Sequence, residues 1–354
     1  MAAGWPRWLL GRLGAAVLVA WVVATVVFFA LRAAGGDPTE AILGGPGSQA
    51  GSEAVARARA DYGLDRPLLV QYLVQIRRVL TLDLGDSYAR KTSVAGLLAD
   101  QLGGTLLLAV LSLALAWVLA LLVATVAARA RGPVGRACAA VLRGVELVAA
   151  VLPHFWLGAV LIVVFSAGLG WFPATSSGSD PAGLVLPTVT LAVPVAGFLG
   201  QLMRDSLAEA AAAPFATTVR ARGASPVRLL WRHTLRHAVL PAVSLSGWAF
   251  GSLLSGAVVV ETLFGRPGLG RLLLDATTSR DVPVVVGTVV VVAVGYVLVV
   301  LLADVAERLL DPRLGSGAPG SSGAAGAPGT GAGTGTGAAP GRGAGRGEDS
   351  AVPA

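Results

Sequence analysis

The side chains that could bind a metal ion or act as nucleophiles are few and far apart in this sequence. The chain contains one cysteine, Cys138, and three histidines, His154, His233 and His237. A single cysteine cannot form an intrachain disulfide, and the histidines are too dispersed to resemble a metal site. We therefore predict no catalytic residue, no metal site and no cofactor bound by this chain.

One short segment, 85–92, comes nearest to a phosphate-binding loop. Its sequence, GDSYARKT, has Arg90 at a position where a P-loop needs glycine, because the backbone approaches the phosphates closely there. We therefore predict that the chain is not an enzyme and does not hydrolyse ATP itself.

His154 is the polar side chain whose position is most informative. It follows Pro153 inside a long apolar run, in the sequence LPHFWLG. A polar ring at membrane depth faces either neighbouring protein or a water-filled cavity. Two interpretations fit this position: a hydrogen-bonded structural histidine, and a side chain that contacts a transported solute. His154 is therefore a candidate pathway residue.

Composition indicates that lipid is the solvent for much of the chain. Of its 354 residues, 55% are hydrophobic and 13% are charged, whereas soluble domains carry about 25% charged residues. The formal net charge of +7 could indicate a nucleic-acid partner. The arginines lie mainly in short loops between apolar runs, however, and membrane topology explains that placement. We predict membrane lipid, and no nucleic acid, as a partner.

Six apolar runs are long enough to cross a bilayer. The first, 8–31, is longer than a signal-peptide core and ends in a poor cleavage site, so we favour a retained span over a cleaved signal. The others contain no Asp, Glu, Lys or Arg, and about 20 helical residues cross the hydrocarbon layer. Each must be helical, because lipid leaves backbone groups no other partner. These five runs are 102–128, 147–168, 184–203, 238–260 and 282–303.

Arginine placement predicts the orientation of the spans. Arginines precede the first run and recur in loops 129–143 and 204–237, whereas loop 169–183 has no Lys or Arg. Three arginines after the fifth run give a weaker opposing signal. The positive-inside rule therefore puts both termini in the cytoplasm.

The predicted organisation is an all-α membrane protein with six transmembrane helices. It consists of a cytoplasmic N-terminus 1–7, a first span 8–31, a helical extracytoplasmic segment 32–101, a five-helix core 102–314 that includes the cytoplasmic loop 204–237, and a Gly/Ala/Pro-rich cytoplasmic tail 315–354. The tail lacks the apolar side chains needed to offset chain entropy, so we predict that it is disordered.

A proton-coupled secondary transporter and a membrane-embedded enzyme are two alternative interpretations of such a membrane protein. A proton-coupled secondary transporter usually keeps ionisable groups inside its spans, and the last five runs contain no acidic residue. Glu146, just before one run, is interpreted as an i,i+3 surface pair with Arg143. A membrane-embedded enzyme would need clustered His, Asp or Glu, which the dispersed histidines do not supply. Energy from a separate subunit fits these observations better.

The loop 204–237 carries the clearest local signals. Helix-forming residues lead to Gly223, which can adopt a left-handed stop. Ser225 and Pro226 then have the residue types of an N-cap and a first helical position. This pattern predicts two short helices joined by a sharp turn that projects into the cytoplasm. An ordinary basic loop lying on anionic lipid is the alternative interpretation.

The segment RARGASP…WRHTLRHAVLP resembles the EAA loop of binding-protein-dependent ABC importer permeases, in the dipeptide, oligopeptide and nickel branch. Thr217, Thr218 and Val219 stand where the general signature has Glu-Ala-Ala. The segments GGDPTE, YGLDRPLLVQYLVQI, LGDSYARKTSV, LPHFWLG and the final DPRL resemble the same family in the same order, up to Leu314. Arg266 departs from the aromatic residue that is common at that position.

The resemblance implies a permease subunit of a bacterial inner (plasma) membrane that forms half of the translocation pathway for peptides or a related small solute. It also implies a second permease subunit, two cytoplasmic ATPase subunits that bind the ATP, and an extracytoplasmic substrate-binding protein that faces segment 32–101 and loop 266–270. In such a permease the short helix near Gly223 couples to the ATPase. The implied contact set is Ala216, Arg220, Gly223, Ala224, Ser225 and Pro226, and Arg220 and Arg222 are candidates for pairing with acidic groups on the ATPase.

Overall fold

The computed structural model describes residues 4–35, 37–44, 50–176 and 180–310, without the side chains of 4–9 and 307–310. Within these ranges the regular elements are helices, and the β-type pairing is one isolated bridge between Asp86 and Ser93. This confirms the predicted all-α class. The tail 315–354, predicted to be disordered, lies outside the described residues.

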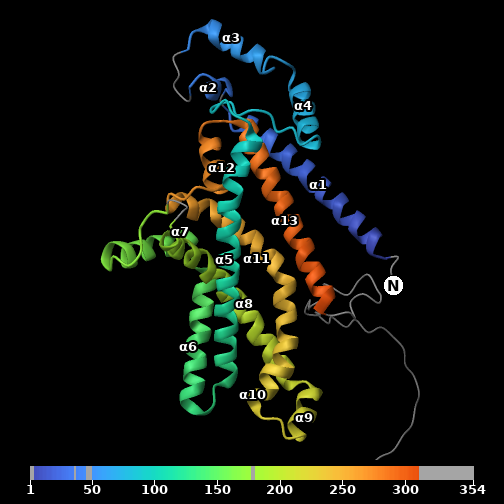
Figure 1. Ribbon diagram of the computed structural model, residues 1–354, viewed down its shortest axis with the longest axis vertical. Helices are drawn as coiled ribbons and strands as arrows, with labels where there is room; N and C mark the ends of the chain where they lie inside the picture. The colour runs from blue at the N-terminus through green and yellow to red at the C-terminus, as the bar shows by residue number, and fades with distance from the viewer. Residues whose placement is uncertain (1–3, 36, 45–49, 177–179, 311–354) are drawn as a thin grey trace, which may run out of the picture. The chain divides into compact units, whose positions relative to one another are not determined.

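The elements follow one another as a series of long and short helices (Figure 1). Their bounds are α1 Gly4–Ala33, α2 Thr39–Ile42, α3 Ser52–Asp61, α4 Leu68–Leu80, α5 Val94–Arg129, α6 Gly132–Val151, α7 His154–Leu161, η1 Ile162–Gly168, α8 Ala182–Ala212, α9 Pro214–Ala221, α10 Pro226–Leu229, η2 Leu230–Thr234, α11 Leu235–Leu263, α12 Leu269–Thr278 and α13 Val282–Leu310.

Five stretches of described helix are long and apolar enough to cross a membrane. A sixth crossing is obtained when α6 and the α7–η1 pair count as one span, although they meet at an angle of 110°. The predicted run 147–168 is therefore not one continuous helix, and the bent pair has the form of a broken span or a re-entrant loop. Pro153 lies in the break between α6 and α7 and lacks the N–H that a continuous helix would use. The five unbroken stretches are Leu10–Ala33, Val94–Arg129, Ala182–Ala212, Pro226–Leu263 and Val282–Ala306.

Helix α8 is the centre of the bundle and packs against α5, α6 and α11 (Figure 1). Its side chains Leu191, Leu199 and Met203 are fully buried, together with Leu108 of α5 and Leu253 of α11. Pro187 and Pro194 both lie inside this single helix. Small residues let its neighbours approach closely, as is typical of helix packing in membranes.

A buried ion pair joins α6 to α8 and corrects the interpretation of Glu146 as a surface residue. The Glu146 side chain is 4% exposed and pairs with Arg204, not with Arg143. Gly200 packs directly on this carboxylate, because a Cβ there would lie 2.6 Å from Glu146 Oε1. Breaking such a pair would leave an uncompensated buried charge, which is costly. Any sliding of α6 along α8 would break the pair, so Glu146 and Arg204 hold the two helices in one register.

The segment between α1 and α5 folds as the short helices α2, α3 and α4, which agrees with the helical segment predicted for 32–101. It is fastened to the loop before α13 by Asp281, which is 2% exposed. Asp281 accepts hydrogen bonds from Ser87 Oγ at 2.5 Å and from the backbone N–H groups of Tyr88 and Ala89, each at 3.1 Å. The P-loop-like segment 85–92 is thus a turn pinned to a carboxylate.

Candidate translocation cavity and coupling elbow

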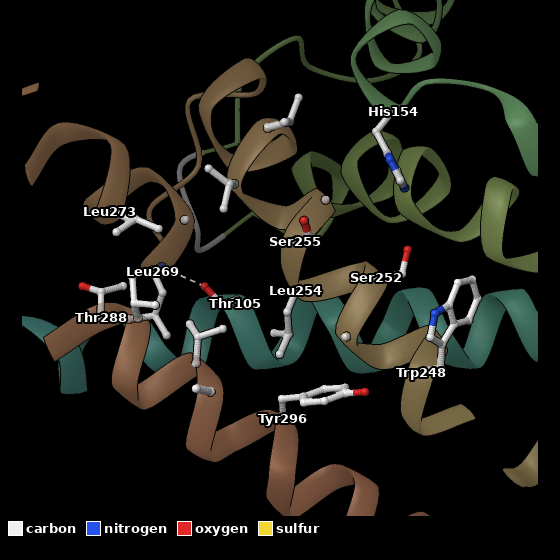
Figure 2. A pocket seen from close by; sticks show the side chains of 18 residues that line it. Thr105, His154, Trp248, Ser252, Leu254, Ser255, Leu269, Leu273, Thr288 and Tyr296 are labelled. Carbon is white, nitrogen blue, oxygen red and sulfur yellow. Dashed lines mark hydrogen bonds between the residues drawn. The ribbon is translucent and has the colours of Figure 1, made fainter. Parts of the chain in front are cut away.

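A cavity of about 850 Å³ lies between α5, α7, α11, α12 and α13 (Figure 2). None of the described residues that line it is charged. Its polar groups come from hydroxyl, indole and imidazole side chains, namely Thr105, His154, Trp248, Ser252, Ser255, Thr288 and Tyr296. A cavity with many apolar walls and a few convergent polar groups is typical of a small-solute site.

His154 lies on this cavity, at the first position of α7. Figure 2 shows its ring and the hydroxyl of Ser252 directed toward each other. Its Nε2 atom is buried and has no hydrogen-bond partner among the described residues. Gly256 lets α11 pass close by, because a Cβ there would lie 3.3 Å from this nitrogen. An imidazole nitrogen without a protein partner can bond a solute or a water molecule.

One wall of the cavity is fixed by a buried carboxylate that the sequence interpretation missed. Glu261 is fully buried in α11, which continues to Leu263 and not only to residue 260. Thr105 Oγ1 donates a hydrogen bond to Glu261 Oε1 at 2.6 Å, and the N–H groups of Gly270 and Arg271 donate to Oε2 at 2.8 and 3.2 Å. Glu261 lies one residue beyond the predicted run 238–260, on the same helix.

This carboxylate joins three helices and is not arranged as a proton relay. Thr105 of α5 also accepts a hydrogen bond from the N–H of Leu269 at 2.8 Å, so α5, α11 and the N-terminus of α12 meet at one point. A carboxylate at a helix N-terminus accepts the N–H groups left without intrahelical partners. We call Thr105, Glu261, Leu269, Gly270 and Arg271 the outer joint.

Arg266 belongs to the buried structure next to the outer joint. Its side chain is 1% exposed, and its Nη1 donates to Ser176 Oγ at 2.8 Å. Its backbone N–H donates to the Glu261 carbonyl at 2.8 Å. The expectation that loop 266–270 faces a binding protein therefore fails for the Arg266 side chain, which fills space between this loop and Ser176.

The opposite end of the bundle carries the turn predicted around Gly223, which we call the coupling elbow, residues 214–229 (Figure 1). Helix α9 ends before Gly223, whose φ of +80° lies in the left-handed region that favours glycine. Ser225 caps α10, because its Oγ accepts a hydrogen bond from the N–H of Arg228 at 3.3 Å, and Pro226 follows as the first helical residue. The predicted stop, cap and helix start are confirmed.

The structure divides the implied contact residues into two groups. Arg220, Gly223, Ser225 and Pro226 are exposed and Ala224 is half-buried, whereas Ala216 is fully buried. Arg220 also donates to the carbonyl of Ala211 at 3.0 Å and so ties α9 to the end of α8.

Ala216 thus supports the elbow from inside, while the turn itself lies on the surface. Further exposed cations, Arg222, Arg228, Arg232 and Arg236, surround the turn and make this end of the molecule basic.

Two family models together match most of the chain. The model of the family described as "binding-protein-dependent transport system inner membrane component" matches residues 118–316, and the model of its N-terminal part matches residues 6–109. The first of these matches contains the coupling elbow, α11 and α12.

Curated relatives match over nearly their whole length. A probable peptide ABC transporter permease protein of Sinorhizobium fredii is 35% identical over 87% of this chain and 98% of the relative. A putative peptide transport system permease protein of Brucella suis is 32% identical over 86% and 98%. A glutathione transport system permease protein of Salmonella typhimurium is 32% identical over 87% and 98%.

Among solved structures, the methionine ABC transporter MetNI in an inward-facing conformation shares the fold. The similarity has a TM-score of 0.52 at 18% identity and covers 60% of this chain and 96% of that one. Within this family the ATPase activity lies in partner subunits, so the chain is not itself an enzyme. The chain belongs to the binding-protein-dependent transport system inner membrane components, as a multi-pass permease subunit of an ABC importer.

Proposed function

We propose that this permease carries peptides or a related small solute through the cavity of about 850 Å³ beside His154. The uncharged polar lining supports this cargo class, because hydroxyl, indole and imidazole groups can bond a peptide's amides without selecting one charge. The permeases of peptides and glutathione among its relatives point to the same class. A second permease subunit completes the pathway.

Filling the cavity tests this proposal. Ser255→Trp places a large ring in the cavity, so uptake of a radiolabelled dipeptide by the reconstituted importer should be lost. Ser244→Trp is the matched control, because Ser244 is an exposed serine on the same helix and does not line the cavity. Equal uptake by both variants would show that the solute takes another route.

The coupling elbow is proposed as the docking site for one of the two cytoplasmic ATPase subunits, with Arg220, Gly223, Ala224, Ser225 and Pro226 as the contact set. Its exposed surface and fixed turn support this role, because a rigid projection can follow the movement of a partner without deforming. ATP bound and hydrolysed by those subunits then biases the bundle between two packed arrangements. Ala216 holds the elbow in shape from its buried position.

The orientation follows from the same proposal. Both termini and the elbow lie in the cytoplasm, whereas α2, α3 and α4 lie outside, where a substrate-binding protein delivers the solute. The concentration of arginine around the elbow supports this orientation through the positive-inside rule. The tail 315–354 is proposed to be a disordered cytoplasmic extension.

Cysteine labelling tests orientation and docking together. Cys138 is an exposed cysteine and can be replaced by serine to give a cysteine-free background. In that background Ser225→Cys should react with an impermeant maleimide only from the cytoplasmic side and should crosslink to an ATPase subunit. Thr277→Cys, at an exposed position of α12, should react only from the other side. Crosslinking of the ATPase by the Thr277→Cys variant and not by the Ser225→Cys variant would contradict the assignment.

A further inference from the structure

Three arginine side chains surround a small hollow at the end of α1, which shares no lining residue with the translocation cavity. The hollow measures about 170 Å³ and is lined by Arg32 of α1, Arg66 before α4 and Arg78 of α4. Asp61 is the single carboxylate among its described lining residues. Three guanidinium groups against one carboxylate leave the hollow with an excess of positive charge.

These arginines are not neutralised by the chain itself. None of the three forms an ion pair within the part of the chain that the structure describes. Arg32 donates to the amide oxygen of Gln71, a neutral acceptor, and its Nε is buried without a hydrogen-bond partner. Arg32 and Arg78 are half-buried, whereas Arg66 is exposed at the rim. Half-buried cations without an anionic partner are costly, so an external anion would stabilise this arrangement.

Neutral donors complete the lining. Gln75 is 8% exposed and Tyr88 is 9% exposed, and both line the hollow beside Tyr62. Burial raises the pKa of the Tyr88 phenol, although nearby Arg78 and Arg32 oppose the shift, so the hydroxyl stays protonated at neutral pH and can donate a hydrogen bond. Guanidinium, amide and phenol donors together suit the oxygen atoms of a phosphate group.

The position of the hollow indicates which phosphate would reach it. Phe28 and Arg32 belong to the last two turns of the span Leu10–Ala33, and Val282 begins another span. The hollow therefore lies where two spans end, which is the depth of lipid headgroups. Helix α4 packs beside this end of α1 (Figure 1), and the hydroxyls of Thr25 and Tyr72 are hydrogen-bonded at 2.9 Å.

Apolar surface continues from the hollow along both helices. On α4, Leu69 and Leu73 are 66% and 56% exposed, and on α1 Val26 and Phe29 are 60% and 44% exposed. Because α1 spans the membrane, its exposed face is covered by acyl chains, and the face of α4 continues that surface. A lipid whose headgroup enters the hollow would place its chains along these side chains.

We propose that Arg32, Arg66 and Arg78 bind the phosphate of an anionic phospholipid whose acyl chains cover the exposed faces of α1 and α4. A headgroup with its own cation, such as phosphatidylcholine, suits the hollow less well because the hollow already carries excess positive charge. In the proposed orientation this lipid belongs to the outer leaflet, and it clamps α4 to the end of α1.

Native mass spectrometry of the intact importer tests this proposal. Importer extracted from nanodiscs of phosphatidylglycerol should retain bound lipid, whereas importer from phosphatidylcholine nanodiscs should not. In Arg78→Gln, retention should fall about tenfold, which corresponds to about 1.4 kcal/mol. Arg77→Gln is the matched control, since Arg77 is the exposed neighbour on α4 and does not line the hollow. Arg78→Lys keeps the charge and should retain most of the lipid.

Three outcomes would overturn the proposal. The first is equal retention of phosphatidylglycerol by Arg78→Gln and Arg77→Gln. The second is equal retention of the two lipids by the unaltered importer. The third is binding of inorganic phosphate at the hollow without any retained phospholipid, which would show that a soluble anion is the occupant.

Discussion

Two joints that contain glycine lie at the two ends of the stretch from Pro226 to Leu263, and they need glycine for different reasons. At the outer joint a Cβ on Gly270 would lie 2.5 Å from the Cα of Val258, so the interior leaves no room for a side chain. At the coupling elbow nothing lies within 4 Å of a Cβ on Gly223, but the φ of +80° favours glycine. Packing therefore defines the outer joint, whereas local backbone conformation defines the elbow and leaves its surface free.

The largest effect is expected at the outer joint. Glu261→Ala leaves the hydroxyl of Thr105 and two backbone N–H groups without their acceptor. Each buried polar group that loses its hydrogen-bond partner costs about 1–3 kcal/mol of stability. We expect about 3 kcal/mol less stability, measured by unfolding of the purified importer in detergent. Glu53→Ala is the control, because its ion pair with Arg57 is exposed. Similar stability of the two variants would show that the Glu261 carboxylate does not hold the outer joint together.

The next effect concerns transport and not folding. Gly223→Asp should abolish solute uptake while the chain stays in the membrane, because the left-handed backbone costs a side chain about 1–2 kcal/mol and the carboxylate alters the elbow surface. Gly132→Asp is a matched control, because Gly132 has a φ of +71°, also has open space around it and lies outside the elbow. Normal uptake-coupled ATP hydrolysis in Gly223→Asp would count against the elbow as the coupling site.

A smaller effect is expected from the cap of α10. Ser225→Ala removes the oxygen that accepts from the N–H of Arg228, which costs about 1 kcal/mol of local stability. Uptake should be reduced but not lost. Ser93→Ala removes a similar cap from α5 and should leave coupling unchanged. If both variants lowered uptake equally, the effect would reflect general stability and not the elbow.

The smallest effect is expected from the tail. Deletion of residues 315–354 should leave uptake intact, because their composition gives them little apolar surface to bury against the bundle. Uptake by the truncated importer checks this expectation. Loss of assembly or transport would assign the tail a role that its composition does not indicate.

Local signals made the elbow predictable from the sequence. Gly223, Ser225 and Pro226 each act on their immediate neighbours, and the structure shows the left-handed residue, the cap and the helix start that they predict. The apolar runs likewise predicted membrane helices, because lipid forces such runs to be helical. Pro153 was recognised in its run, but the 110° bend beside it depends on tertiary packing and was not predicted.

Contacts between residues far apart in the chain could not be predicted from local sequence signals. Glu261 bonds Thr105, which lies 156 residues away, and Glu146 pairs with Arg204 across two helices. From spacing along the chain, Arg143 was predicted as the partner of Glu146. The apolar run was predicted to end at residue 260, one residue before Glu261. The signal that could have revealed Glu261 is an acidic residue at the end of an apolar run, followed three residues later by the glycine-rich sequence FGRPGLG.

Hydrogen–deuterium exchange of the permease, alone and assembled with its ATPase subunits, tests the contrast between the two joints most directly. The backbone N–H groups of 268–276 should be equally protected in both states, because Glu261 and buried packing already hold them. Those of 214–229 should become markedly more protected only in the assembly. Unchanged exchange in 214–229, or new protection confined to 268–276, would contradict the elbow as the docking site.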